Sequence, residues 1–166
     1  MAMTDAIVQE IEQEAATTRR VLERVPADQL SWKPHTKSMS LGELALHVAQ
    51  TPGMIAGWVE AGAYEFSGNM KQAEATSSEE ILAAHDAGVS RAKSVVAATG
   101  DAGLGAEWKG TAGGKTLMAM PKGALVRAVM LNHWYHHRGQ LSVYLRLLNV
   151  PVPSIYGPSA DENPFA

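Results

Sequence analysis

Apolar positions recur every three to four residues along most of the chain, which is the spacing of amphipathic helices. The pattern predicts four helices, with the bounds Thr4 to about Val25, Leu41 to about Ala61, Ser78 to about Thr99, and Pro121 to about Leu148. Four helices of this length predict an all-α fold, a four-helix bundle. No repeat or linker interrupts the pattern, so we expect a single domain over residues 1–166.

Capping residues mark where the predicted helices begin. Thr4 can cap the first helix, and Ser40 with Glu43 has the spacing of a capping box at the start of the second. Ser77 with Glu80 repeats this spacing before the third helix. Inside the second helix, Pro52 is expected to kink or split the chain, with Thr51 as a second cap.

Two segments lie outside the helical pattern. The glycine-rich stretch from Gly100 to Met120 is expected to form a long loop or a short two-stranded excursion. The tail from Val150 onward holds four of the eight prolines and is expected to be extended.

The amino-acid composition disfavours a nucleic-acid-binding protein and excludes sites that need cysteine. The net charge is −3, from 14 Lys and Arg against 17 Asp and Glu, and no long basic run suggests a nucleic-acid partner. The absence of cysteine excludes disulfides, thiolate metal sites and a cysteine nucleophile. No charged and then apolar leader opens the chain, and no apolar run has the length of a membrane span. We therefore expect a cytoplasmic protein without a membrane partner.

Histidines carry the candidate chemistry. His133 and His137 are four residues apart in the fourth predicted helix, and a count of 100° per residue puts both in the middle of its apolar face. The same count puts His47 in the middle of the apolar face of the second helix. Two helices thus direct three histidines toward the interior of the bundle.

Three inward imidazoles favour a metal site. Burying unpartnered imidazoles costs on the order of a few kcal/mol, and a metal ion removes that cost by binding the neutral ring nitrogens. Three histidines leave one coordination position open, as in catalytic zinc sites. Zinc or nickel suits this donor set, and iron, manganese and copper remain open. A lone core histidine, held neutral by one hydrogen bond, is the alternative for His47 taken by itself.

The surroundings of these histidines exclude some enzyme classes. His133 is followed by Trp134 and not by the glutamate of zinc peptidases, and the Glu-x-x-His motif of di-iron bundles is absent. His85 lies on the apolar face of the third helix, as a fourth ligand, a pocket base or a core histidine. His136 is either a partner of a ligand or a boundary residue, and His35 is assigned to a surface loop.

The predicted site is open to solvent. Thr51 and Gln140 are polar residues one turn from His47 and His137. Arg138 is a candidate for binding an anionic substrate or, alternatively, a solvated or interface residue. The segment Gly100–Gly114 and the tail are expected to form the rim of a cleft. A fourth protein ligand, His85 in the first place, would instead make the site closed and structural.

Three stretches together resemble the DinB/YfiT-like superfamily: "SWKPHTKSMSLGELALHVAQ", "NHWYHHRGQLSVYLR" and "VPVPSIYGPSADE". The resemblance covers nearly the whole chain and implies a four-helix bundle, often a homodimer, with a divalent metal held by His47, His133 and His137. It also implies thiol-dependent transferase or isomerase chemistry, as in characterised relatives. A surplus of small residues in the second and third helices is the other reason to expect a homodimer.

Two functions follow as expectations. The first is a metal-dependent enzyme acting on a small-molecule substrate, a low-molecular-weight-thiol S-transferase or isomerase, whose catalytic residues the sequence does not identify. The alternative is a non-catalytic metal- or ligand-binding protein of a stress response. A nucleic-acid-binding role is disfavoured by the acidic balance.

Overall fold

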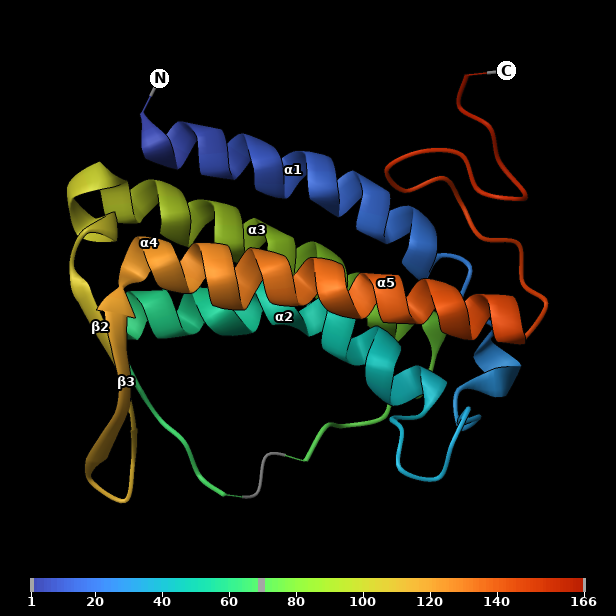
Figure 1. Ribbon diagram of the computed structural model, residues 1–166, viewed down its shortest axis with the longest axis horizontal. Coiled ribbons are helices and arrows are strands. Elements are labelled where there is room, and N and C mark those ends of the chain that lie inside the picture. Colours follow the sequence, from blue (N-terminus) through green and yellow to red (C-terminus); the bar gives the residue numbers. More distant parts are fainter. Residues whose placement is uncertain (1, 69–70, 166) are drawn as a thin grey trace.

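A computed structural model describes residues 2–68 and 71–165. Long helices lie side by side along most of its length: α1 (Met3–Leu22), α2 (Leu41–Ala61), α3 (Ser78–Leu104) and α5 (Asn132–Leu147) (Figure 1). Shorter helical segments are η1 (Ala27–Gln29), α4 (Lys122–Ala124) and η2 (Leu125–Leu131). The predicted four-helix arrangement is therefore correct, with α4, η2 and α5 forming its last member.

A small sheet at one end of the bundle makes the all-α prediction wrong in part. Its strands are β1 (Ala63–Glu65), β2 (Glu107–Ala112) and β3 (Lys115–Pro121), in the order β1-β2-β3. β2 and β3 form an antiparallel hairpin, as the alternative for the glycine-rich stretch proposed, and β1 pairs with β2 in parallel. Gly113 and Gly114 make the turn with φ of 55° and 74°, which glycine adopts without strain.

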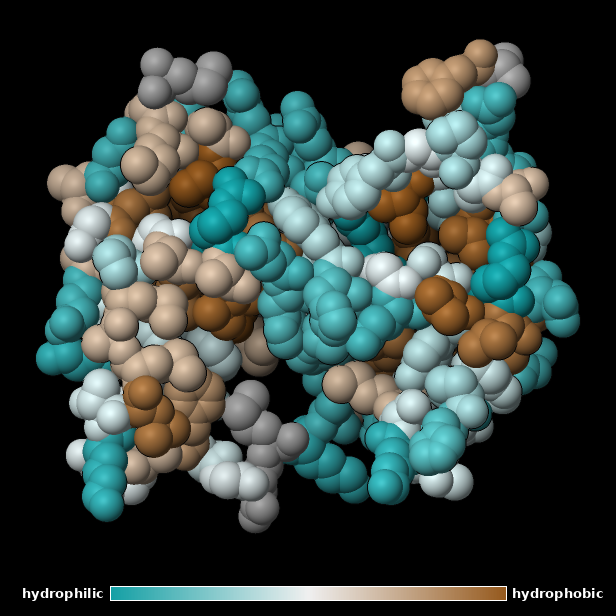
Figure 2. Space-filling view, viewed as in Figure 1, coloured by the Kyte–Doolittle hydropathy of each residue, from teal (hydrophilic) through white to brown (hydrophobic). Residues whose placement is uncertain are grey.

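The hairpin carries exposed apolar side chains. Leu117 and Met118 of β3 are 60% and 41% exposed. Apolar residues gather over this end of the molecule in Figure 2, whereas hydrophilic residues cross the middle of the face viewed.

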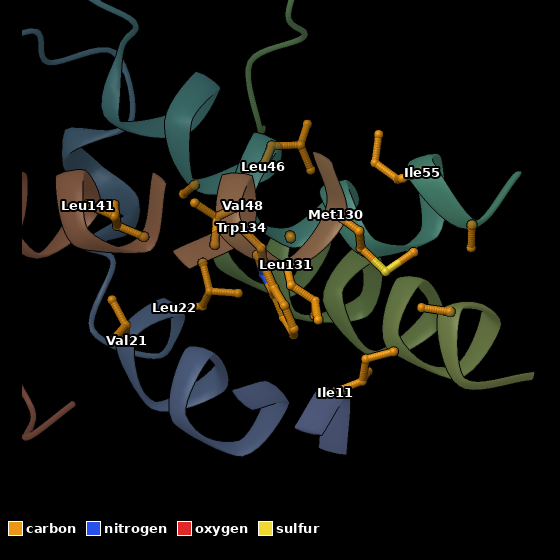
Figure 3. Close-up of a cluster of buried hydrophobic side chains, with 14 of the residues drawn as sticks. Ile11, Val21, Leu22, Leu46, Val48, Ile55, Met130, Leu131, Trp134 and Leu141 are labelled. Atoms are coloured by element: carbon orange, nitrogen blue, oxygen red, sulfur yellow. The ribbon is translucent and has the colours of Figure 1, made fainter. Parts of the chain in front are cut away.

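The core lies between α1, α2, α3 and the C-terminal helical run. Figure 3 shows Trp134 of α5 directed toward Ile11 and Leu22 of α1, with Leu46 and Ile55 of α2 farther from α1. Each of these side chains is buried, and apolar burial is the main driving force for packing the bundle. Among the described residues, no helix combines the length and apolar character that crossing a membrane requires.

The helix starts agree in part with the predictions. The Ser40 and Glu43 side chains exchange hydrogen bonds with each other's backbone N–H, so this capping box is confirmed. Ser77 accepts from the Glu80 N–H, but the Glu80 carboxylate accepts from Thr76. Thr4 lies inside α1, where its N–H and hydroxyl donate to the Asp101 carboxylate.

α2 continues through Pro52. The helix is one element from Leu41 to Ala61, so it bends rather than splits (Figure 1). Thr51 is fully buried, and its hydroxyl donates to the His47 carbonyl at 2.6 Å. Thr51 thus neither caps a second helix nor lines an open site, because its side chain is used within its own helix.

A π-helical stretch, η2, precedes α5. The backbone N–H of Asn132 donates to the Arg127 carbonyl, five residues earlier. The buried pairs Leu125 with Met130 and Val126 with Leu131 have the same five-residue spacing. A π-helix has more residues per turn than an α-helix, so a count of 100° per residue does not carry through this segment.

α2 and α3 make a close approach at two glycines. A Cβ added to Gly53 would lie 2.7 Å from the Gly88 Cα, which is closer than real Cβ atoms come to backbone. Ala45, Ala49 and Ala92 nearby are fully buried. The small residues of these helices therefore serve packing within the chain and no longer argue for a homodimer, which stays a prediction resting on the resemblance.

We predict that Gly53→Ala lowers the free energy of unfolding by about 1–3 kcal/mol, because overpacking forces the two backbones apart. Gly139→Ala in α5 is the matched control, since its Cβ would meet nothing within 4 Å. That variant should gain up to about 1 kcal/mol from helix propensity. Urea denaturation followed by circular dichroism measures both, and equal stability of Gly53→Ala and wild type would contradict the close approach.

Candidate metal centre

The structure brings His47, His133 and His137 together. One nitrogen from each ring can be chosen such that all three lie within 4.8 Å of one another. The Nε2 atoms of His47 and His133 are 2.9 Å apart, and the ring centroids of His137 lie 4.5 Å from His47 and 4.4 Å from His133. α2 and α5 thus contribute to one cluster, as the sequence predicts.

The cluster lies at the border of the buried face of α5 and not at its middle. The buried residues of α5 are Trp134, Arg138, Leu141 and Leu145, and all three histidines are half-buried. Each ring consequently has one side against the bundle and another toward solvent. This partial exposure agrees with the expectation of an open site.

Two glutamines hold the rings in place. His47 Nδ1 lies 2.9 Å from Gln72 Oε1, and His137 Nδ1 lies 2.7 Å from Gln140 Oε1. An amide oxygen only accepts, so in both rings Nδ1 carries the proton and Nε2 is left with its lone pair. Such outer partners set the tautomer and orientation of metal-ligating histidines. Gln140 was expected to line the site, whereas nothing in the sequence pointed to Gln72.

The cluster is held in its neutral form. Burial lowers the pKa of His47, although the hydrogen bond to Gln72 acts in the opposite direction. Burial also lowers the pKa of His133, helped by the charges that His47 and His136 would carry. Burial lowers the pKa of His137 to about 4. Neutral rings with free lone pairs are the form that binds a metal ion, so this donor set fits one.

The remaining histidines fall outside the cluster. His136 is exposed on α5, with its ring centroid 4.9 Å from that of His137. His35 is exposed in the connector, where its Nδ1 accepts from the Lys37 N–H. His85 is 2% exposed, and its Nε2–H donates to the Ala15 carbonyl of α1. His85 is therefore a core histidine and not a fourth member of the group.

Arg138 is neither solvated nor free to bind a substrate. It is 1% exposed, and its guanidinium donates to the Glu14 carboxylate at 2.6 Å, to Thr18 and to the Tyr156 hydroxyl. The expectation of a surface residue is wrong because a charged side chain can be buried when it is paired and hydrogen-bonded, as Arg138 is with Glu14. Tyr156 belongs to the tail, so Arg138 joins α5 to both α1 and the C-terminal segment.

A hollow of about 410 Å³ lies beside His47. Its lining is Met39, His47, Gln50, Met54, Lys71, Gln72 and Ala73. The rim therefore comes from Met39, α2 and residues 71–73, and neither Gly100–Gly114 nor the tail lines it as expected. The tail instead packs on α1 and α5 through contacts such as Arg20 with Glu162 and Arg146 with Asp161.

Fold and cluster together define a helix-bundle protein with a three-histidine group that can hold a metal ion. The family model of the DinB family matches residues 1–164. The chain belongs to the DinB family.

Two solved structures share the fold. A DinB-like protein from Bacillus cereus ATCC 10987 has a TM-score of 0.73 at 21% identity, over 92% of this chain and 97% of that chain. The DinB-like protein YjoA of Bacillus subtilis has a TM-score of 0.67 at 22% identity, over 88% and 96%. In sequence, the uncharacterized protein YrdA of Bacillus subtilis (strain 168) is 44% identical over 43 residues. That match spans 26% of this chain and only 25% of YrdA.

Buried His85 makes stability depend on pH. Burial lowers its pKa, so the unfolded chain takes up a proton near pH 6.5 while the folded protein does not. The stability contributed by neutral His85 is complete above about pH 6.5 and is lost as the pH falls further. The stability advantage of wild type over His85→Gln should shrink below that pH by up to about 1.4 kcal/mol per unit. Urea titrations from pH 8 to pH 5 measure it, and a constant difference would contradict the argument.

Proposed function

We propose that His47, His133 and His137 bind one divalent metal ion and that the protein is a metal-dependent enzyme acting on a small molecule. The observation that carries this proposal is a group of three neutral histidines with ligand nitrogens within 4.8 Å of one another. Zinc or nickel suits the all-imidazole donor set, and iron or manganese remains compatible.

The reaction we propose is S-transfer or isomerisation that uses a low-molecular-weight thiol. When bound, a divalent cation supplies Lewis acidity, which lowers the pKa of a thiol or water beside it. The chain has no cysteine, so the thiol must come from a small molecule. The hollow beside His47 gives such a molecule access, while Gln72 and Gln140 keep the Nδ1 protons of two rings directed away from the cluster.

Metal binding is tested with protein purified without an affinity tag. We predict one divalent ion per wild-type chain and none in His133→Ala, measured by mass spectrometry of the metal after dialysis. His136→Ala is the matched control, because His136 is exposed beside the cluster but is not one of its three members. The His136→Ala variant should keep the metal. If wild-type protein supplied with zinc and nickel still contains no bound metal, the proposed site is refuted.

Second, we predict that Gln72→Leu and Gln140→Leu weaken metal affinity by about 10- to 100-fold, because the rings lose the acceptors that fix their tautomers. A competition titration with a metal chelator measures the affinity of each variant. Unchanged affinity in both would mean that the glutamines do not support the ligands.

Catalysis is tested by following the loss of an electrophile with each cellular thiol, with and without added metal. The enzyme proposal expects turnover that requires both metal and thiol and that His133→Ala abolishes. A protein that binds metal stoichiometrically but turns over no electrophile would support the alternative, a non-catalytic metal-binding protein.

A further inference from the structure

The hollow beside His47 continues along the seam between α2 and α3. A second hollow of about 440 Å³ is lined by Gln50, Gly53, Met54, Ala84, Ala87, Gly88 and Arg91. Gln50 and Met54 line both hollows, so the two adjoin along α2 and we treat them as one groove. We call it the α2–α3 groove.

The helices present this groove through regular spacing. His47, Gln50 and Met54 are three and four residues apart on α2, and Ala84, Ala87 and Arg91 repeat that spacing on α3. Residues at these intervals share one helix face. Between them Gly53 meets Gly88 backbone to backbone, so no side chain fills the seam. The groove has an apolar middle and the histidine cluster at one end.

The charges along the groove have one sign. Arg91 lies at the end far from the cluster, and Lys71 lies at the cluster end. Among the described residues, no aspartate or glutamate lines either hollow, although the chain carries 17 of them and a net charge of −3. A groove whose described charged residues, Lys71 and Arg91, are both cations favours an anionic occupant.

Arg91 is held at its end of the groove. A Cβ on Gly57 would lie 3.1 Å from one Arg91 guanidinium nitrogen, so the guanidinium rests directly on the α2 backbone. Its ion pair with Glu60, at 3.0 Å, is between two exposed side chains and is therefore weak. Glu60 lies outside the groove lining, which leaves the planar guanidinium able to accept a carboxylate.

The length of the groove sets the size of the occupant. His47 and Gly57, where Arg91 rests, are ten residues apart on α2, a span of about 15 Å at about 1.5 Å per residue. An extended peptide covers about 3.5 Å per residue, so an occupant of up to about four residues fits within this span. A single amino acid is too short to reach both ends.

We propose that the α2–α3 groove binds a carboxylate-bearing small molecule the size of a tripeptide, with one carboxylate at Arg91 and another at Lys71. The apolar middle at Met54, Ala84 and Ala87 contacts its body. The placing of its reactive end at His47 rests on the proposed metal-dependent function, whereas the anion-binding groove does not. Arg91 and Lys71 are specificity-determining residues for this occupant.

The test uses the full chain and three probes: glutathione, S-methylglutathione, which lacks a free thiol, and glutathione diethyl ester, which lacks free carboxylates. We expect calorimetry to show binding of the first two and at least about tenfold weaker binding of the ester, with affinity that falls as salt is added. Glutathione binding stronger than that of S-methylglutathione in zinc-loaded protein assigns the sulfur to the cluster end.

Substitutions distinguish binding in the groove from nonspecific electrostatic binding elsewhere on the protein. Arg91→Gln and Lys71→Gln should each weaken S-methylglutathione binding by about five- to tenfold, and Ala87→Trp should abolish it by filling the groove. Lys115→Gln, an exposed cation on the hairpin, is the control and should have no effect. Glu60→Gln should leave binding equal or tighter, because it frees Arg91.

Binding of S-methylglutathione to metal-free His133→Ala tells the two proposals apart. Binding retained there supports the groove whatever becomes of the metal centre. Failure of all three probes at millimolar concentration, with wild-type metal content intact, overturns the groove and leaves the metal centre standing. A dimer mass by light scattering that Ala87→Trp converts to monomer would also overturn it, since a second copy would then occupy the groove.

Discussion

The rotation of α5 about its own axis is the constraint on which the histidine cluster depends. Trp134, Leu141 and Leu145 are fully buried on one side of this helix, and turning them toward solvent would expose large apolar surfaces. Arg138 fixes the same rotation by a different force. Its guanidinium is buried against Glu14 and Tyr156, and a buried charge without partners costs several kcal/mol. His133 and His137 each precede one of these anchors by a single residue, so their rings are held at the edge of the core.

That edge position explains why three imidazoles are both neutral and accessible. Full burial would leave their nitrogens without partners, and full exposure would let them protonate near neutral pH. At the border, burial lowers the pKa of each ring while one side stays open. Gln72 and Gln140 then satisfy the Nδ1 protons of two rings. The Nε2 atoms of His47 and His133 lie 2.9 Å apart, so a proton on His133 Nε2 is donated to the His47 lone pair unless both lone pairs are given to a shared cation.

Sequence periodicity predicts the ligand group because the four-residue spacing of His133 and His137 is local and lies wholly within α5. It places the buried face wrongly for two reasons. First, η2 is π-helical, so the angular positions counted at 100° per residue are shifted before α5 begins. Second, the sequence does not indicate that Arg138 is buried, because its hydrogen-bond acceptors come from α1 and the tail. Gln72 could not be found either, because its contact with His47 joins a loop to a helix 25 residues away. For the glycine-rich stretch the sequence leaves a loop and a two-stranded hairpin open, and the structure has the hairpin. The parallel pairing of β1 with β2, which extends it to three strands, is not predicted from the sequence.

Gln72, which orients His47, also lines the hollow beside it. Lys71, Gln72 and Ala73 line the hollow beside His47, and Gln72 is at the same time the acceptor for its Nδ1 proton. This short segment is anchored immediately afterward, where Glu74 accepts from the Ser40 hydroxyl and Ala75 is buried. A displacement of residues 71–73 that widened the hollow would also remove the acceptor that keeps His47 Nε2 free of a proton. The opening of this hollow and the tautomer of His47 are therefore coupled through one side chain, whereas His137 takes its acceptor from within α5 and stays independent of the loop.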